Sequence, residues 1–394
     1  MSANFTNAPD RTHTNSLKWT QYPAGVIPVW VADTDFQAPE PILAALRSKL
    51  EHGVLGYEFP QKALLETIAA RMDSLYGWSV EPEAVVATPG LIAAFNAAAW
   101  ATCKAGQGIL TQPPAYPPFL GVAGNVGLVD QFAQLCLEER DGLLSYRIDW
   151  DVFRAALHSG HARTGLFLLC NPHNPTGQVY SRAELLGMAE LCLENDVCIV
   201  ADEIHSELLL GGSKHTPIAS LSKDIERNTI TLVAPSKTYN IPGLFCGFAI
   251  IPDPQLRSKF KAASDRMIHH VSSLSLIAAQ AAYSGECDDW LNAMRARLTA
   301  NRDWLVATLR DSFPLLRSTL PQATYLAWLD CHRLQLREQT PYDFFLEQAR
   351  VAFTKGEDFG PGGQGFVRLN FGTTPQVLQT AMARVGAALA AAVH

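Results

Sequence analysis

The chain has no excess of basic residues and no long apolar run. Its 394 residues include 31 Lys and Arg against 38 Asp and Glu, for a formal net charge of −7. This balance disfavours a nucleic acid or an anionic membrane as partner, because both bind basic surfaces. No stretch reaches the roughly 20 apolar residues that span a bilayer. The alanine-rich segment Leu91–Ala101 is short and is interrupted by Asn96.

Paired cysteines and a signal sequence are missing as well. The eight cysteines stand singly with no C-x-x-C spacing, and Cys170 and Cys198 lie inside apolar runs. Scattered, core-like thiols are typical of a reducing compartment and disfavour a disulfide framework or a zinc site. The segment Met1–Asp10 is polar and lacks the apolar core of a signal peptide. We therefore expect a cytoplasmic protein without a metal ion.

What is present is an alternation of short apolar runs and helical patterns. This alternation indicates an α/β fold with a mostly parallel sheet and helices on both of its faces. After about Ser284 the pattern changes to that of a smaller α+β unit. We expect a division into an arm at 1–45 that packs with the small domain, a large domain at 46–283 and a small C-terminal domain at 284–394.

The expected strands are Val85–Ala87, Gly108–Thr111, Gly165–Cys170, Val197–Ala201, Thr229–Val233, Cys246–Ile251, Thr324–Leu329 and Phe366–Phe371. The expected helices are Leu91–Thr102, Arg182–Asn195, Trp290–Phe313, Tyr342–Arg350 and Gln376–Val393, whereas Met1–Thr20 shows no regular pattern.

Chemically useful side chains follow these strands. In an open parallel sheet, ligands bind at the carboxyl ends of the strands, so the residues just after each run carry the most information. Lys237 can form an imine with an aldehyde. Asp202 can pair with a pyridinium nitrogen, and Asn174 can donate to a phenolate oxygen.

Two further positions fit the same kind of ligand. The helix N-terminus at Gly90, Leu91 and Ile92 offers backbone N–H groups to a phosphate, and Tyr116 can stack on a flat ring. Taken singly, Lys237 would be a surface lysine and Gly90 a loop glycine. The prediction of one site depends on all these residues following strands in a single order.

These residues lie in recognisable motifs. N-P-H-N-P-T-G at 171–177, A-D-E at 201–203 and S-K-T at 236–238, with Arg368 near the end, resemble the class I/II aminotransferase family of fold-type I pyridoxal-phosphate (PLP) enzymes. The resemblance covers most of the chain. It implies the aspartate-aminotransferase fold, PLP as cofactor, Lys237 as the imine-forming catalytic lysine and Arg368 as the clamp for a substrate carboxylate.

Other segments resemble the MalY/PatB branch of cystathionine β-lyases and cysteine-conjugate C–S lyases. They are Trp30–Phe36, Gly53–Tyr57, Asp202–His205 and Ser236–Asn240. The branch implies a lyase that cleaves L-cystathionine or related S-substituted cysteines to a thiol, pyruvate and ammonia. It also implies a homodimer with shared active sites, in which Tyr57 reaches the phosphate of the neighbouring subunit's cofactor. The residues implied to contact the cofactor are Asp202, Asn174, Tyr116, Gly90, Leu91, Ile92, His205, Ser236 and Tyr57, and Ala32 joins Arg368 at the substrate.

The sequence departs from the common aminotransferase pattern at three positions. His205 replaces a tyrosine, Phe245 stands where an arginine usually binds the phosphate, and Ala234 replaces a serine. The first two replacements are shared with the lyase branch. Phosphate binding would then depend on the helix end at Gly90, on Ser236 and on Tyr57.

Two alternatives remain open. An aminotransferase would use the same scaffold and the same residues, and only the resemblance favours the lyase. A non-catalytic PLP-binding regulatory protein is disfavoured by the intact set of Lys237, Asp202, Asn174 and Arg368. The glycine-rich segment Gly360–Gly365 is either a mobile element near the substrate or a plain turn.

Overall fold

The computed structural model describes residues 5–158, 162–267, 270–336 and 339–392. Its larger sheet has seven strands in the order β2-β10-β9-β8-β7-β3-β4, and β10 alone runs antiparallel to its neighbours. The strands are β2 (Val85–Thr88), β3 (Gly108–Thr111), β4 (Val129–Phe132), β7 (Thr164–Cys170), β8 (Cys198–Asp202), β9 (Thr229–Val233) and β10 (Gly247–Ile250). The mostly parallel sheet of an α/β fold, expected from the sequence, is confirmed.

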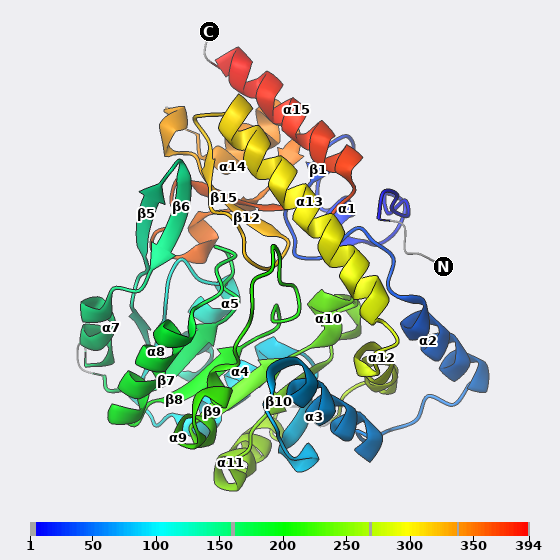
Figure 1. Cartoon of the computed structure of the whole chain (residues 1–394), viewed down its shortest axis with the longest axis vertical. Helices are drawn as coiled ribbons and strands as arrows, with labels where there is room; N and C mark the ends of the chain where they lie inside the picture. The colour runs from blue at the N-terminus through cyan, green and yellow to red at the C-terminus, as the bar shows by residue number, and fades with distance from the viewer. Residues whose placement is uncertain (1–4, 159–161, 268–269, 337–338, 393–394) are drawn as a thin grey trace.

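Helices cover both faces of this sheet, as Figure 1 shows. Alternate side chains of a strand point to opposite faces. In β7, Leu166 and Leu168 pack in the cluster of α4 (Leu91–Thr102) and α11 (Pro254–Ser264). Phe167 and Leu169 pack in the cluster of α7 (Trp150–Leu157) and α8 (Arg182–Glu194). Burial on both faces explains why this strand is apolar throughout.

A second, smaller sheet lies beyond the first. It is antiparallel, in the order β11 (Arg317–Ser318), β12 (Leu326–Asp330), β15 (Phe366–Asn370) and β14 (Thr354–Lys355). The long helix α13 (Asp288–Ser312) and the last helix α15 (Pro375–Ala392) bury their apolar residues in the same core as β12 and β15. Figure 1 shows α13 running from the large sheet's side of the molecule to this second sheet.

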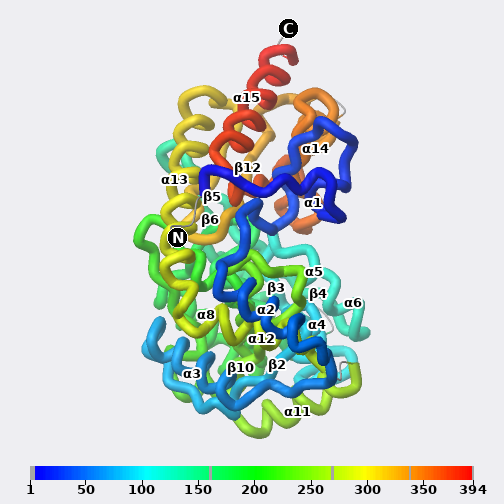
Figure 2. Tube along the Cα trace, turned by 90° about the vertical axis from the view of Figure 1, so that its right-hand side faces the viewer, coloured from blue at the N-terminus to red at the C-terminus, as the bar shows by residue number. Residues whose placement is uncertain are grey.

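The N-terminal segment lies along the part of the molecule that holds the second sheet, as Figure 2 shows. Strand β1 (Ile27–Pro28) pairs in parallel with β13 (Val351–Ala352). The backbone N–H of Asn370 donates to the carbonyl of Val29 at 2.8 Å. The chain then forms α2 (Glu40–His52), which packs against α12 (Ser273–Tyr283). The division at 1–45, 46–283 and 284–394 stays a prediction.

Several expected boundaries are wrong. Thr324 has a positive φ of 71°, so β12 begins at Leu326 instead. The helix expected at 342–350 is a short α14 (Pro341–Phe344) continued by a wider, π-helical turn, Phe345–Ala349. The expected irregular arm contains a short helix, α1 (Leu17–Thr20). Residue 393, expected in the last helix, lies outside the described residues.

The segment Gly360–Gly365 forms a turn. The N–H of Gly363 donates to the carbonyl of Gly360 at 3.0 Å, and the N–H of Phe366 donates to that of Gly363 at 3.2 Å. A Cβ on Gly363 would lie 2.0 Å from the backbone oxygen of Gly356. This close backbone approach favours the plain turn over the mobile element.

No helix in the described ranges is long and apolar enough to cross a membrane.

Candidate active site

A cavity of about 690 Å³ opens where β7, β8 and β9 end. Its wall contains every residue that the sequence placed at the site except one: Ala32, Gly90, Leu91, Ile92, Tyr116, Asn174, Asp202, His205, Ser236, Lys237 and Arg368. The exception is Tyr57, which does not line it. The strand-end argument predicted several of these residues, whereas Ala32 and Arg368 were implied only by the resemblance, and the fold brings both groups into one cavity.

Lys237 lies in the short helix α10 (Pro235–Thr238), directly after β9. Its Nζ donates a hydrogen bond of 2.7 Å to the carbonyl of Ala32. Burial and, after it, the charge of Arg368 lower the pKa of Lys237 to about 8, against the raising effects of Asp33 and Asp202. A lysine with this pKa exists partly as the neutral amine near neutral pH, which is the form that acts as a nucleophile or base.

Asp202 is the last residue of β8, and its carboxylate lies in the cavity. Its Oδ1 accepts the backbone N–H of Ile204 at 3.1 Å. Burial raises the pKa of Asp202 to about 7, against the lowering effects of that hydrogen bond and of Lys237. A cationic ligand group opposite Asp202 would favour its ionised form.

Arg368 extends from β15 of the second sheet into the same cavity. Its guanidinium donates to Oδ1 of Asn174 at 2.9 Å and to the carbonyl of Trp30 at 3.2 Å. Its Nε is buried and has no hydrogen-bond partner among the described residues. Burial lowers the pKa of Arg368 to about 10, so the side chain stays charged at neutral pH. It can therefore bind a ligand carboxylate.

His205 and Tyr116 are aromatic parts of the wall. Burial, with smaller contributions from the charges of Lys237 and Arg368, lowers the pKa of His205 to about 3, so its ring is neutral. Its Nδ1 is buried without a hydrogen-bond partner in the described chain. Tyr116 caps the short helix α5 (Pro117–Leu120), whose first two residues are prolines that restrict the backbone.

The N-terminus of α4 forms another part of the wall. Gly90 precedes the helix with φ 108° and ψ 166°, a conformation that side chains disfavour, and no side chain caps the helix. The first N–H groups, at Leu91 and Ile92, therefore point outward for an anion. Among the described residues of the wall, Lys237 and Arg368 are the only lysine or arginine.

Tyr57 lies elsewhere on the surface. Its side chain is 89% exposed, and its ring centroid is 4.9 Å from that of His270. The structure of one chain does not bring it to the cavity, so its predicted role across a subunit interface stays a prediction.

The sequence argument missed the residues that hold the loop 30–36. The hydroxyl of Tyr325 donates to the carbonyl of Ala32 at 3.0 Å. The amide of Asn370 donates to the carbonyls of Val31 and Asp33, both at 2.6 Å. The segment is visible in the sequence as a motif, but its backbone acceptors leave no signal in side-chain types.

These groups fit PLP. The cavity offers an amine for an imine, a carboxylate for a ring nitrogen, an amide for a ring oxygen and a helix end for a phosphate. The buried, unpartnered Nδ1 of His205 and Nε of Arg368 are further positions where a ligand can supply the missing partner. The described residues contain no cluster of three His, Cys, Asp or Glu side chains that could hold a metal ion.

Fold and site together define an enzyme of the aminotransferase fold. The chain belongs to the aminotransferase class I and II family, whose sequence profile matches residues 32–385. Within that family it lies in the PatB and MalY branch. It is 38% identical to cystathionine beta-lyase PatB of Bacillus subtilis, over 98% of this chain and 100% of that protein.

Two solved structures show the same likeness. Cystalysin from Treponema denticola, which contains a PLP cofactor, superposes with a TM-score of 0.93 at 29% identity over 99% of this chain and 100% of that one. The PLP-bound C–S lyase from Staphylococcus hominis superposes with a TM-score of 0.91 at 29% identity, over 99% and 98% of the two chains.

Proposed function

We propose that this protein is a PLP-dependent carbon–sulfur β-lyase. It would cleave L-cystathionine or related S-substituted cysteines, with water, to a thiol, pyruvate and ammonia. The observation that carries the proposal is the buried Lys237 amine, with a pKa near 8, in one cavity with Asp202, Asn174 and Arg368. The names of PatB and of the Staphylococcus hominis enzyme favour the lyase over an aminotransferase on the same scaffold.

Several cavity residues would hold the cofactor. Asp202 would pair with the ring nitrogen and keep it protonated, and Asn174 would donate to the ring oxygen. Tyr116 would pack against the ring face. The N–H groups at the start of α4 and the Ser236 hydroxyl would bind the phosphate. When bound, PLP supplies an electron sink for the negative charge that develops at the substrate Cα.

Lys237 and Arg368 act on the substrate. Arg368 binds the α-carboxylate and so fixes which bond at Cα faces the lysine. The neutral Nζ of Lys237 takes the Cα proton. The ammonium that results remains beside the Ala32 carbonyl, its acceptor at 2.7 Å. Loss of the thiolate from Cβ, followed by hydrolysis, completes the reaction.

The proposal includes a homodimer in the cytoplasm. Exposed apolar side chains at Leu55, Tyr57 and Phe59 form a surface that a second copy would bury, and they support a dimer in which Tyr57 serves the neighbouring site. All eight cysteines are free thiols, which supports a reducing compartment.

The test is the K237A variant, assayed for thiol release from S-substituted cysteines. Because Lys237 both binds PLP and moves the Cα proton, turnover should fall by at least about a thousandfold, within the range that general-base and covalent catalysis supply together. The matched control is K223A, which removes an exposed lysine whose ion pair with Glu226 lies outside the cavity. Substantial steady-state activity in K237A, comparable to that of K223A, would overturn the assignment.

A further inference from the structure

The loop 30–36 connects the N-terminal arm to the catalytic lysine. It has no helix or strand, and side chains from other parts of the chain bind its backbone carbonyls. Ala32 provides the acceptor for the Lys237 amine. The next residue, Asp33, therefore places a carboxylate one peptide unit from that acceptor.

Asp33 shares its cationic partners with a second carboxylate. Its Oδ2 accepts from NH2 of Arg11 at 2.6 Å. Its Oδ1 is buried, makes no hydrogen bond with the described residues and lies 3.8 Å from Nζ of Lys18. Both cations are shared with Asp35, which lies 3.0 Å from Arg11 and 2.9 Å from Lys18. Two cations thus serve two carboxylates, and the Asp33 Oδ1 remains without a hydrogen bond.

We propose that Asp33 and Arg11 are positioning residues that set the protonation of Lys237. The Asp33 carboxylate favours the ammonium form of Lys237, and Arg11 offsets part of that effect by pairing with Asp33. The inference rests on the proposed function, because it concerns the amine that receives the Cα proton. Neither residue lines the cavity, so both act on the Lys237 amine without touching the ligand.

The charges around Lys237 support this role. Arg368 disfavours its ammonium form, and Asp33 and Asp202 favour it. His205 is neutral because burial lowers its pKa to about 3. Tyr116 and Tyr325 are neutral because burial raises their pKa values.

Cofactor binding would change how strongly Asp33 and Asp202 each act on the pKa of Lys237. In the loaded enzyme Asp202 would be engaged by the ring nitrogen, which would compensate its charge. Of the two carboxylates that raise the pKa of Lys237, Asp33 would then be the one that the cofactor leaves uncompensated. The ammonium formed during turnover would thus be stabilised by the Ala32 carbonyl and by the charge of Asp33.

The test uses variants whose effects have opposite signs. D33N removes the negative charge, so the pH midpoint of the visible absorption band of the PLP-loaded enzyme should fall by about one unit. R11Q leaves Asp33 less compensated, so the midpoint should rise. D33E keeps the negative charge, so its pH midpoint should stay near that of the unmodified protein.

The matched control is R384Q. The Arg384 guanidinium also donates to a backbone carbonyl of the N-terminal segment, that of Gly25 at 2.6 Å, but it does not pair with the loop 30–36. The pH midpoint of R384Q should therefore equal that of the unmodified protein. This comparison separates the charge effect from any loosening of the arm.

The outcomes are distinct. Opposite shifts in D33N and R11Q support the inference, whereas equal midpoints or shifts of the same sign overturn it, because a merely structural role would not depend on the sign of the charge removed. If D33N does not fold, the direction of the R11Q shift decides alone. Failure of the unmodified protein to form the visible band would instead overturn the proposed function.

Discussion

At the scale of single residues, the site is a group of buried ionisable side chains whose pKa values differ from their ordinary values. Burial moves the pKa of Lys237 down to about 8 and that of Asp202 up to about 7. Arg368 is shifted down to about 10 and keeps a buried, unpartnered Nε. Buried charges without full partners are costly, and a ligand that supplies the partners stabilises the folded chain.

The phosphate end of the cavity gives a prediction about one residue. Phe245 lines the cavity together with Gly90–Ile92, and its side chain is 69% exposed. An arginine there would add a cation to a phosphate otherwise held by N–H and hydroxyl groups. We expect F245R to lower the PLP dissociation constant about tenfold, since a charged hydrogen bond contributes about 1.5–3 kcal/mol. Equilibrium titration of the apoprotein measures it.

The control for this prediction is F245L, which changes the side chain without adding charge. Both replacements keep an unbranched Cβ at a residue with φ 48°, so backbone strain is comparable. If F245R binds PLP no more tightly than F245L, the phosphate does not lie at this end of the cavity.

Residue roles were predictable where side-chain chemistry carried them. Lys237, Asp202 and Asn174 follow apolar strands, and the fold brings them into one cavity. The acceptor for the lysine is a backbone carbonyl, that of Ala32, and an alanine side chain announces nothing about it. The contribution of Tyr325 could not be predicted either, because its hydroxyl reaches that carbonyl from 293 positions away along the chain.

At the scale of elements, one buried arginine joins the segments that carry the site. Arg71 of α3 (Lys62–Tyr76) binds both carboxylate oxygens of Glu207, at 3.0 and 2.6 Å. It also donates to the hydroxyl of Tyr239 and to Asp288, each at 2.9 Å. Glu207 follows the strand of Asp202, and Tyr239 lies two residues after Lys237. The contacts of Arg71, which form the junction, therefore join the loops after Asp202 and Lys237 to α3 and α13.

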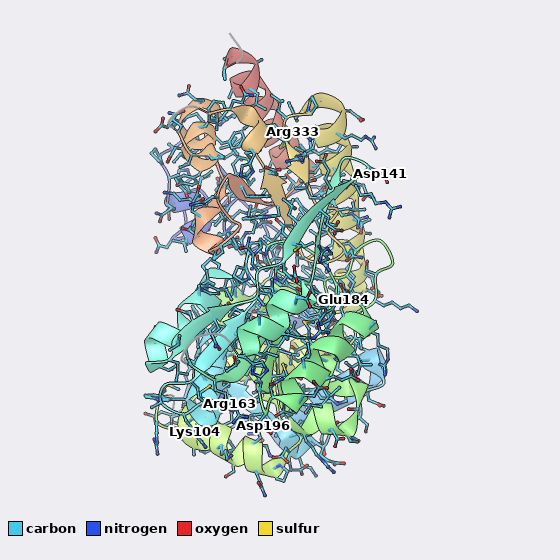
Figure 3. The ribbon with its side chains drawn as sticks, turned by 90° about the vertical axis from the view of Figure 1, so that its left-hand side faces the viewer. Lys104, Asp141, Arg163, Glu184, Asp196 and Arg333 are labelled. Carbon is cyan, nitrogen blue, oxygen red and sulfur yellow. The ribbon has the colours of Figure 1, made fainter. Side chains whose placement is uncertain are left out.

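We expect R71M to lower the free energy of unfolding by about 3–5 kcal/mol, because it leaves the buried Glu207 carboxylate without its partner. Urea denaturation measures the change. The matched control is R163Q, which breaks the exposed ion pair between Arg163 and Asp196; both residues are labelled in the lower part of Figure 3. That change should stay within about 1 kcal/mol. Equal effects of the two variants would contradict the junction's importance.

Element types were easier to predict than their limits. The apolar run of β9 is bounded as expected, since burial on both faces leaves a continuous signal. The start of β12 was missed because the left-handed backbone of Thr324 is set by its tertiary surroundings. Helix α11 was not predicted, although the sequence carries signals for its start, namely Asp253 as its cap and Pro254 at its first position.

At the scale of the whole molecule, the exposed apolar residues are those that the proposed homodimer would bury. Leu55, Tyr57 and Phe59 are exposed, and Tyr57 lies outside the cavity of its own chain. No pattern in a single sequence places residues across a subunit interface, so the predicted role of Tyr57 depends on the resemblance alone.

A complementation experiment tests the shared site. Y57F should weaken PLP binding and activity, while K237A abolishes turnover. Mixing and refolding the two variants should restore activity, because a hybrid dimer has one site with both lesions and one with none. Random exchange makes about half of the dimers hybrids, so about a quarter of the unmodified activity is expected. If the mixture is no more active than Y57F diluted by the inactive variant, Tyr57 does not contribute to the site of a neighbouring subunit.

The most direct test of the central claim is a product assay with the PLP-loaded enzyme and L-cystathionine, with no keto acid present. The account predicts pyruvate in many equivalents per active site, together with an equal amount of thiol, because β-elimination regenerates the cofactor in each turnover. Pyruvate that never exceeds the enzyme concentration, with amino-group exchange appearing once a keto acid is added, would contradict the lyase and identify an aminotransferase.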